Sequence, residues 1–417
     1  MSSLHVFWGA PSELSDAPIA AEILNPDLEL VRSVVISGRG ATLDVPPGRY
    51  VVRARLPSGE TTRASVDVPT GSSAVVELKM SRSPHEWLSR QHFLGDFAQV
   101  RAPEEMVAAL DAIQPQLWVF EDREWRPAEH VLPFNHDFDF SLAAAVYRVK
   151  VPKPDRLYLC QVESKSFPGR FVAVPVPKDG EVELLVRPAR APSPRNGGVS
   201  VKVGTRDVRT ETLLHYLASG AVEAARTVAD DALEPTMEAL DQAFAEKLLR
   251  DKLENPFAAA IGGYFLLRIG AHERLHDWPN NFAEWIGWLP DAAVVHAWQM
   301  LRSPEGEPDV ERIRARLLQA VRAGIPAFTE GMRLLVDGLD MCATDARAAG
   351  TPDDEVEEAL AVIRRYASLT DWDQDVTTFY AIHPGSSWEG PRRRWNARTI
   401  ELSFSMSQGY AEAGATA

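Results

Sequence analysis

The feature that most constrains the fold is a change of hydrophobic period near residue 210 of the 417-residue chain. Upstream, apolar and polar residues alternate in short runs separated by Gly and Pro, which is typical of antiparallel strands. Downstream, to about residue 369, apolar residues recur every three or four positions, as on one face of a helix. The sequence therefore predicts a multidomain α+β protein in which two antiparallel β-rich modules precede an α-helical domain.

The first module, residues 1–82, is expected to be a β-sandwich. Six of its apolar residues fall on one face of consecutive strands at period two: Leu43, Val45, Tyr50, Val52, Ala54 and Leu56. The stretch ATLDVPPGRYVVRARLPSG resembles the transthyretin-like module called the carboxypeptidase regulatory-like or PEGA domain. This resemblance implies a non-catalytic stabilising or adhesive unit, and many such modules lie outside the cytoplasm.

The rest of the chain divides by composition and period. Residues 83–115 are polar and predict a helical connector, and residues 116–208 contain strand-like runs such as QLWVFED and RFVAVPVP, which predict a second β-rich domain. Residues 209–370 predict the helical domain. Residues 371–417 are expected to pack back on the β part through aromatic strand-like pieces, with a disordered end.

Seven or eight short helices are expected in the helical domain, because prolines punctuate it at positions where a first turn tolerates them. The expected core positions include Val310, Ile313, Leu317, Val321, Val356, Leu360 and Ile363. The run AAAIGGYFLLRIG is similar to the packed helix of a tetratricopeptide repeat, which implies a solenoid of helical hairpins. A compact bundle is the alternative, because no strict repeat length recurs.

The formal net charge of −15 argues against a nucleic-acid partner, because phosphate groups would be repelled. The longest apolar run, residues 257–267, is too short to span a membrane. The first residues lack the charged and apolar regions of a secretory signal, so a cytoplasmic location is expected. The chain has two cysteines, Cys160 and Cys342, which are expected to be buried free thiols.

One pentapeptide spells the zinc metallopeptidase motif: His272, Glu273 and His276 in the order His-Glu-x-x-His. On an α-helix the two imidazoles would face one side and bind zinc, and the glutamate would act as general base. Gly270 and Pro279 flank the motif, however, and are typical of a helix end and a helix start. No third ligand stands at a familiar spacing. The alternative interpretation is a polar corner between two helices, with Leu275 and Trp278 turned inward.

Two other short clusters combine possible metal ligands. One contains His136, Asp137 and Asp139, where the alternating phenylalanines also fit a core-facing strand. The other contains His85, Glu86 and His92, where an N-capping box with Ser83 as cap and Glu86 at N3 is the favoured interpretation. The basic stretch GPRRRWNAR at residues 390–398 is more typical of an ion-paired interface than of a nucleic-acid site in so acidic a chain.

The segment with the highest aromatic density is a candidate partner surface. It contains Trp278, Phe282, Trp285, Trp288 and Trp298, more aromatic bulk than a short helical pair needs for its own core. The leading hypothesis is a non-catalytic interaction protein that presents a helical surface to a protein partner and needs no cofactor. The alternatives are a zinc hydrolase built on the pentapeptide and a structural subunit of a larger assembly.

Overall fold

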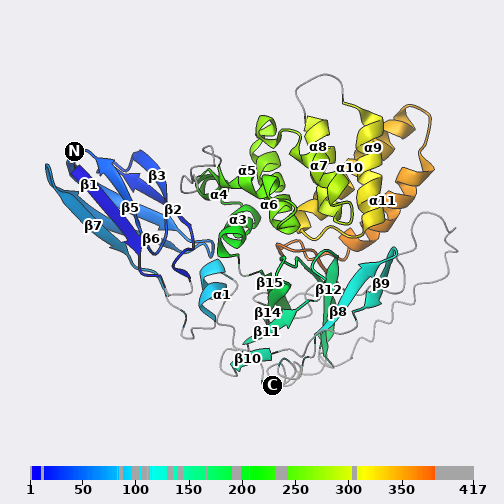
Figure 1. Ribbon diagram of the computed structural model, residues 1–417, viewed down its shortest axis with the longest axis horizontal. Coiled ribbons are helices and arrows are strands. Elements are labelled where there is room, and N and C mark those ends of the chain that lie inside the picture. The colour runs from blue at the N-terminus through cyan, green and yellow to red at the C-terminus, as the bar shows by residue number, and fades with distance from the viewer. Residues whose placement is uncertain are drawn as a thin grey trace, which may run out of the picture.

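The computed structural model describes residues 2–10, 14–81, 83, 88–95, 104, 110, 113, 115–128, 135–139, 144–151, 153–164, 167–189, 199–205, 207–230, 243–302 and 308–380. The N-terminal strands form a body at one end of the long axis, and the helices lie beside it (Figure 1). The second group of strands lies below the helices in this view. This arrangement confirms the predicted fold class of β-rich modules followed by a helical domain.

The N-terminal body is a sandwich of a three-stranded sheet, β4-β1-β7, and a four-stranded sheet, β3-β2-β5-β6. Its strands are β1 Ser2–Trp8, β2 Ile19–Leu24, β3 Leu30–Ile36, β4 Ala41–Val45, β5 Gly48–Arg55, β6 Thr61–Val68 and β7 Ser73–Leu78. The six residues predicted on the inner face are all buried. The pairing is not wholly antiparallel, because β7 returns from the other sheet to lie parallel to β1.

The second β part also has two sheets, β10-β11-β14-β15 and β16-β13-β12-β8-β9. Its strands are β8 Gln116–Glu121, β9 Glu124–Pro127, β10 Asn135–Asp139, β11 Ala144–Lys150, β12 Tyr158–Ser164, β13 Phe167–Val174, β14 Glu181–Pro188, β15 Val199–Gly204 and β16 Thr378–Tyr380. Strand β16 follows the helices in sequence and pairs with β13, so the chain returns to this sheet after the helical part.

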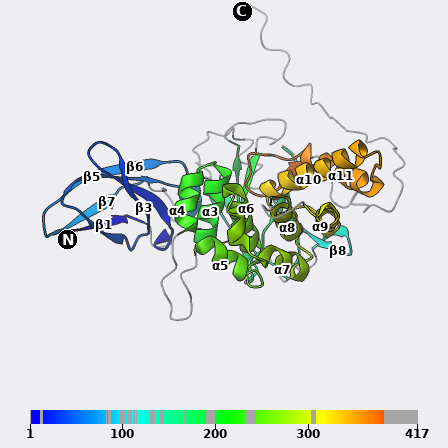
Figure 2. The ribbon, with the colours of Figure 1, turned by 90° about the horizontal axis from the view of Figure 1, so that it is seen from above.

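The helices are α1 Ser89–Leu94, α3 Val208–Ala218, α4 Val222–Ala229, α5 Phe244–Arg250, α6 Pro256–Ile269, the 3₁₀ helix η3 His272–Leu275, α7 Trp278–Trp285, α8 Pro290–Arg302, α9 Val310–Ala323, α10 Thr329–Ala348 and α11 Asp354–Ala367. Helix α8 contacts α6, α7, α9 and α10. Figure 2 shows the helices in a row from α4 to α11, beside the sandwich. In the described part of the chain, every helix is too short or too polar to cross a membrane.

One hydrophobic core runs through both the second β part and the helices. The Phe379 ring of β16, for example, stacks on Phe171 of β13 with centroids 5.5 Å apart and meets Tyr366 of α11 edge-on at 5.2 Å. The boundary predicted at residues 208–209 therefore separates two kinds of secondary structure and not two cores. The N-terminal sandwich keeps its own core, into which α1 inserts Phe93.

Candidate functional site

The pentapeptide of the zinc hypothesis lies in a short turn. Residues His272–Leu275 form the 3₁₀ helix η3, and His276 ends it with φ 48° and ψ −144°. A 3₁₀ helix has about three residues per turn, so residues four apart do not share a face. The shared face that the two imidazoles need in a zinc helix is therefore not formed.

The contacts of this turn are structural. The Arg274 guanidinium bonds to Glu246 through Nε at 2.5 Å and pairs with Asp230 at 2.8 Å, and these carboxylates raise its pKa. The carbonyl of His276 accepts a hydrogen bond from Gln299 at 2.5 Å. Leu275 is buried and Trp278 is half-buried. This is the geometry of a polar corner between α6 and α7.

The structure does not bring the five aromatic residues of the predicted partner surface together. Phe282 and Trp298 are buried in the core, and the Trp298 indole donates to the Leu334 carbonyl at 2.9 Å. Trp278 and Trp288 are half-buried against the same core. Only Trp285 of these five is largely exposed, at 57%, with the Lys252 ammonium 5.1 Å from its ring centre.

The other sequence candidates give no metal centre in the described part of the chain. Asp137 bonds to Arg148 at 2.7 Å, and His92 lies on α1. His85, Glu86, residues 390–398 and the side chains of His136 and Asp139 lie outside the described residues. Among the groups that the structure does describe, no three His, Cys, Asp or Glu side chains are placed to hold one ion.

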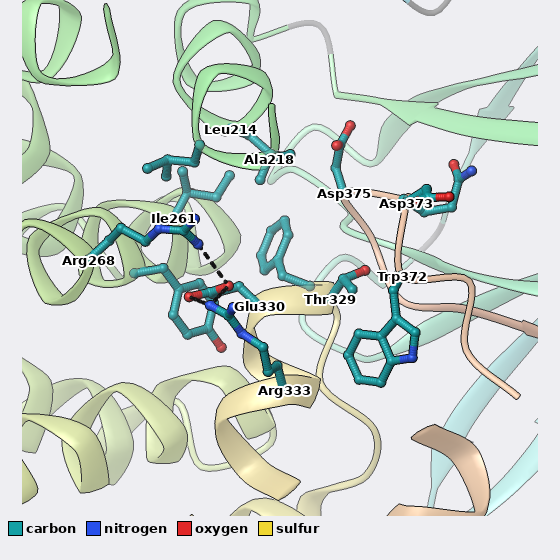
Figure 3. A pocket seen from close by; sticks show the side chains of 14 residues that line it. Leu214, Ala218, Ile261, Arg268, Thr329, Glu330, Arg333, Trp372, Asp373 and Asp375 are labelled. Atoms are coloured by element: carbon teal, nitrogen blue, oxygen red, sulfur yellow. Dashed lines mark hydrogen bonds and ion pairs between the residues drawn. The ribbon is translucent and has the colours of Figure 1, made fainter. Parts of the chain in front are cut away.

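A cavity of about 500 Å³ opens where the helices meet the second β part. It lies between the end of α3, the middle of α6, the start of α10 and the turn at residues 372–375 (Figure 3). Its apolar lining comes from α3, α6 and the residue before α10 and consists of Leu214, Leu217, Ala218, Ile261 and Phe328. Its polar lining consists of Tyr264, Arg268, Thr329, Glu330, Arg333, Trp372, Asp373, Gln374 and Asp375.

Two arginines share one carboxylate on the wall formed by α6 and α10. Glu330 accepts from Arg333 at 2.5 and 2.6 Å and from Arg268 at 3.4 Å. In Figure 3 these three side chains lie together on the side of the cavity opposite Asp373 and Asp375. One negative charge thus partly neutralises two positive charges that are already close to one another.

The opposite wall contains a second charge cluster. Asp375 Oδ2 lies 3.1 Å from Lys202 Nζ and 3.2 Å from His215 Nε2. The other ring nitrogen of His215 is 3.0 Å from the Glu211 carbonyl, which can only accept. The Lys202 ammonium therefore compensates the charge of Asp375 within the protein.

A fully buried carboxyl group supports the floor of the cavity. Asp291, at the start of α8, accepts from Tyr264 Oη at 2.7 Å and from the Ala327 amide at 2.7 Å. Burial raises the pKa of Asp291 to about 6, although these hydrogen bonds oppose the shift. Its contacts fix the backbone that leads into α10, and thereby place Thr329 and Glu330 at the cavity.

Sequence reasoning missed this cavity because its lining comes from four distant segments. The local signal that could have marked it is the stretch DWDQD at residues 371–375, in which acidic side chains flank a tryptophan between a helix and a strand. Binding residues are often on loops, and an aromatic ring beside carboxylates can hold a cation.

The comparisons with known proteins concern this part of the chain. Residues 212–409 match the family model described as the Y4kD C-terminal domain. The match covers slightly less than half of the chain and contains every residue that lines the cavity. A comparison with curated proteins gave no match. The similarity therefore concerns the helical part and the turn that closes the cavity, and leaves the N-terminal sandwich outside it.

Proposed function

We propose that the chain is a cytoplasmic, non-catalytic interaction protein that binds an extended segment of a protein partner in the cavity between α3, α6, α10 and residues 372–375. The observation that carries this proposal is the cavity itself. Its volume of about 500 Å³ is in the range of pockets that bury a small ligand and corresponds to roughly the bulk of a tripeptide.

The chemistry of the lining also supports a peptide ligand. Apolar side chains such as Leu214 and Ile261 stand on one side, and charged side chains stand on two others. A peptide offers apolar and charged side chains at a spacing of a few ångströms, together with backbone donors and acceptors. Trp372 adds an aromatic ring that is 40% exposed in the absence of a partner, and such rings are common anchors in protein interfaces.

The test is a selection of phage-displayed random peptides on the immobilised full-length protein and, in parallel, on Ala218→Trp. Ala218 is an exposed alanine that lines the cavity, so an indole at this position fills the space without disturbing the core. The matched control is Ser219→Trp, which adds the same bulk at the next exposed residue, outside the lining.

We expect peptides that are enriched on the wild type and on Ser219→Trp but not on Ala218→Trp. Peptides that bind all three proteins equally would contradict the proposal, as would a selection that enriches nothing. Peptides whose binding is lost only in Trp285→Ala would show that the partner surface lies at the exposed tryptophan of α7.

A further inference from the structure

Two polar atoms at the cavity have unused capacity to accept hydrogen bonds. Thr329 is only 8% exposed, and its hydroxyl has no partner among the described residues. The buried amide oxygen of Gln374 is also without a partner there, and its orientation is set by the amide nitrogen, which bonds to Asp371 at 3.4 Å. Buried acceptors are normally satisfied, so both atoms indicate a donor that the described part of the chain does not supply.

These acceptors stand on the same wall as a tryptophan and an uncompensated carboxylate. Trp372 and Asp373 directly precede Gln374 in the sequence. The Thr329 amide donates to the Asp375 carbonyl at 3.1 Å, and this hydrogen bond fixes the start of α10 against the turn. Figure 3 shows Thr329 between Trp372 and Asp375. The Asp373 carboxylate is exposed and has no ion-pair partner within the described part of the chain.

The other charges of the cavity are compensated to different degrees. Asp375 is paired with Lys202 and faces His215, and Glu330 is shared by Arg268 and Arg333. Asp373 is therefore the carboxylate of this wall that is left to pair with a ligand. The net charge of −15 adds a long-range attraction for a cationic partner.

We propose that this wall binds the guanidinium group of an arginine in the partner's segment, with its plane on the Trp372 ring, its charge beside Asp373, and its N–H groups donated to Thr329 Oγ1 and Gln374 Oε1. A guanidinium fits because it is planar, stacks on aromatic rings and carries five donors without any acceptor. The inference rests on the proposed function, since it names the residue that the bound peptide must contain.

The test begins with the sequences of the peptides selected through the cavity. We expect a fixed arginine in them. The best peptide is then synthesised twice, with arginine and with citrulline, which keeps the shape but removes the charge, and both are titrated into the full-length protein by calorimetry. Loss of the charge should weaken binding by at least about tenfold, as expected for a hydrogen-bonded charged group.

Variants of the wall separate recognition from structure. Asp373→Asn should weaken binding of the arginine peptide by about tenfold and leave binding of the citrulline peptide nearly unchanged. Trp372→Leu should also weaken binding of the arginine peptide by about tenfold, and binding of the citrulline peptide by less, because only the arginine peptide loses a cation–π contact. Asp155→Asn removes the same charge from an exposed position on the second β part, and Trp285→Leu removes an exposed indole elsewhere. Neither control should change the affinity. Thr329→Val should weaken binding without lowering the free energy of unfolding, because the hydroxyl has no partner among the residues that the structure describes.

The possible failures can be told apart. A selection without any cavity-dependent peptide would refute the proposed function. Cavity-dependent peptides without a fixed arginine, or with equal affinity for the citrulline form, would refute the guanidinium site and leave the proposed function standing. Agmatine, titrated as a free guanidinium ligand, should bind far more weakly than the peptide. Equal affinity for agmatine would support the guanidinium site but refute a peptide as its source.

Discussion

The Asp291 carboxyl group offers a test of the cavity floor, because the structure gives both the sign and the magnitude of its effect on the free energy of unfolding as the pH changes. The perturbation is Asp291→Asn, which keeps the size of the side chain and removes its charge. In the wild type, burial raises the pKa of Asp291 from 3.8 to about 6 in the folded state. Below pH 3.8 both folded and unfolded chains are protonated at this position, and above pH 6 both are ionised.

Between these two values the folded state binds the proton more tightly than the unfolded state does. The contribution of Asp291 to stability is therefore fully present below the unfolded pKa and is lost as the pH rises through the folded pKa. The shift spans roughly two pKa units at about 1.4 kcal/mol each, which gives a total loss of about 3 kcal/mol. About 2 kcal/mol of this loss falls between about pH 4.5 and pH 7.5.

The assay is urea unfolding of both proteins, followed by the circular dichroism of the helices, at a series of pH values. The other titrating groups are common to both proteins and cancel in the difference. The stability of Asp291→Asn relative to wild type should rise by about 2 kcal/mol from about pH 4.5 to about pH 7.5. A difference that is flat across this range, or that falls with rising pH, would refute the assignment of a buried carboxyl with a raised pKa.

Three further variants test particular contacts. Gly331→Ala should lower the free energy of unfolding by about 1–3 kcal/mol in urea titrations, because its methyl group would meet Tyr264 Oη and lie 2.7 Å from Asp291 Oδ1; a neutral effect would show that this pair can move. Trp298→Ala should lower the free energy of unfolding by about 3–5 kcal/mol and Trp285→Ala by less than about 1 kcal/mol, since only the first indole is buried and hydrogen-bonded. Equal decreases of the melting temperature in the two variants would contradict this difference. Protein purified from zinc-supplemented cells without chelator should contain no stoichiometric zinc by elemental mass spectrometry, because η3 does not place His272 and His276 on one face; about one zinc per chain that is lost in His272→Ala would restore the hydrolase hypothesis.

The fold class was predictable because hydrophobic period is a local property. Val356, Leu360 and Ile363 recur as on one face of a helix, and all three are buried in α11. The same rule fails at Val310, which is 54% exposed. This residue is the first of α9, and the hydrophobic period does not show what covers the end of a helix. Gly270 has φ +73° and ends α6, as its position beside the pentapeptide predicted.

The candidate site was not predictable, because it depends on which elements meet. The hydrophobic period shows that Ile261 and Leu214 lie on apolar helix faces. It does not show that α3 and α6 face the turn at residues 372–375 across a cavity. The burial of the aromatic segment was not predictable for a related reason. Sequence gives the bulk of Phe282 and Trp298, and only the packing of α7 and α8 shows that this bulk is buried. The resemblances to a transthyretin-like module and to a tetratricopeptide repeat remain predictions.

The central claim is that a peptide binds in the cavity, and photo-crosslinking tests it most directly. A cavity-selected peptide carrying a benzophenone group is bound to the full-length protein and irradiated, and the attachment sites are located by peptide mass spectrometry. We expect attachment within two segments that line the cavity, Phe328–Glu330 together with Arg333, and residues 372–375. Attachment at Trp285, or sites scattered over the surface with no attachment in these two segments, would contradict it.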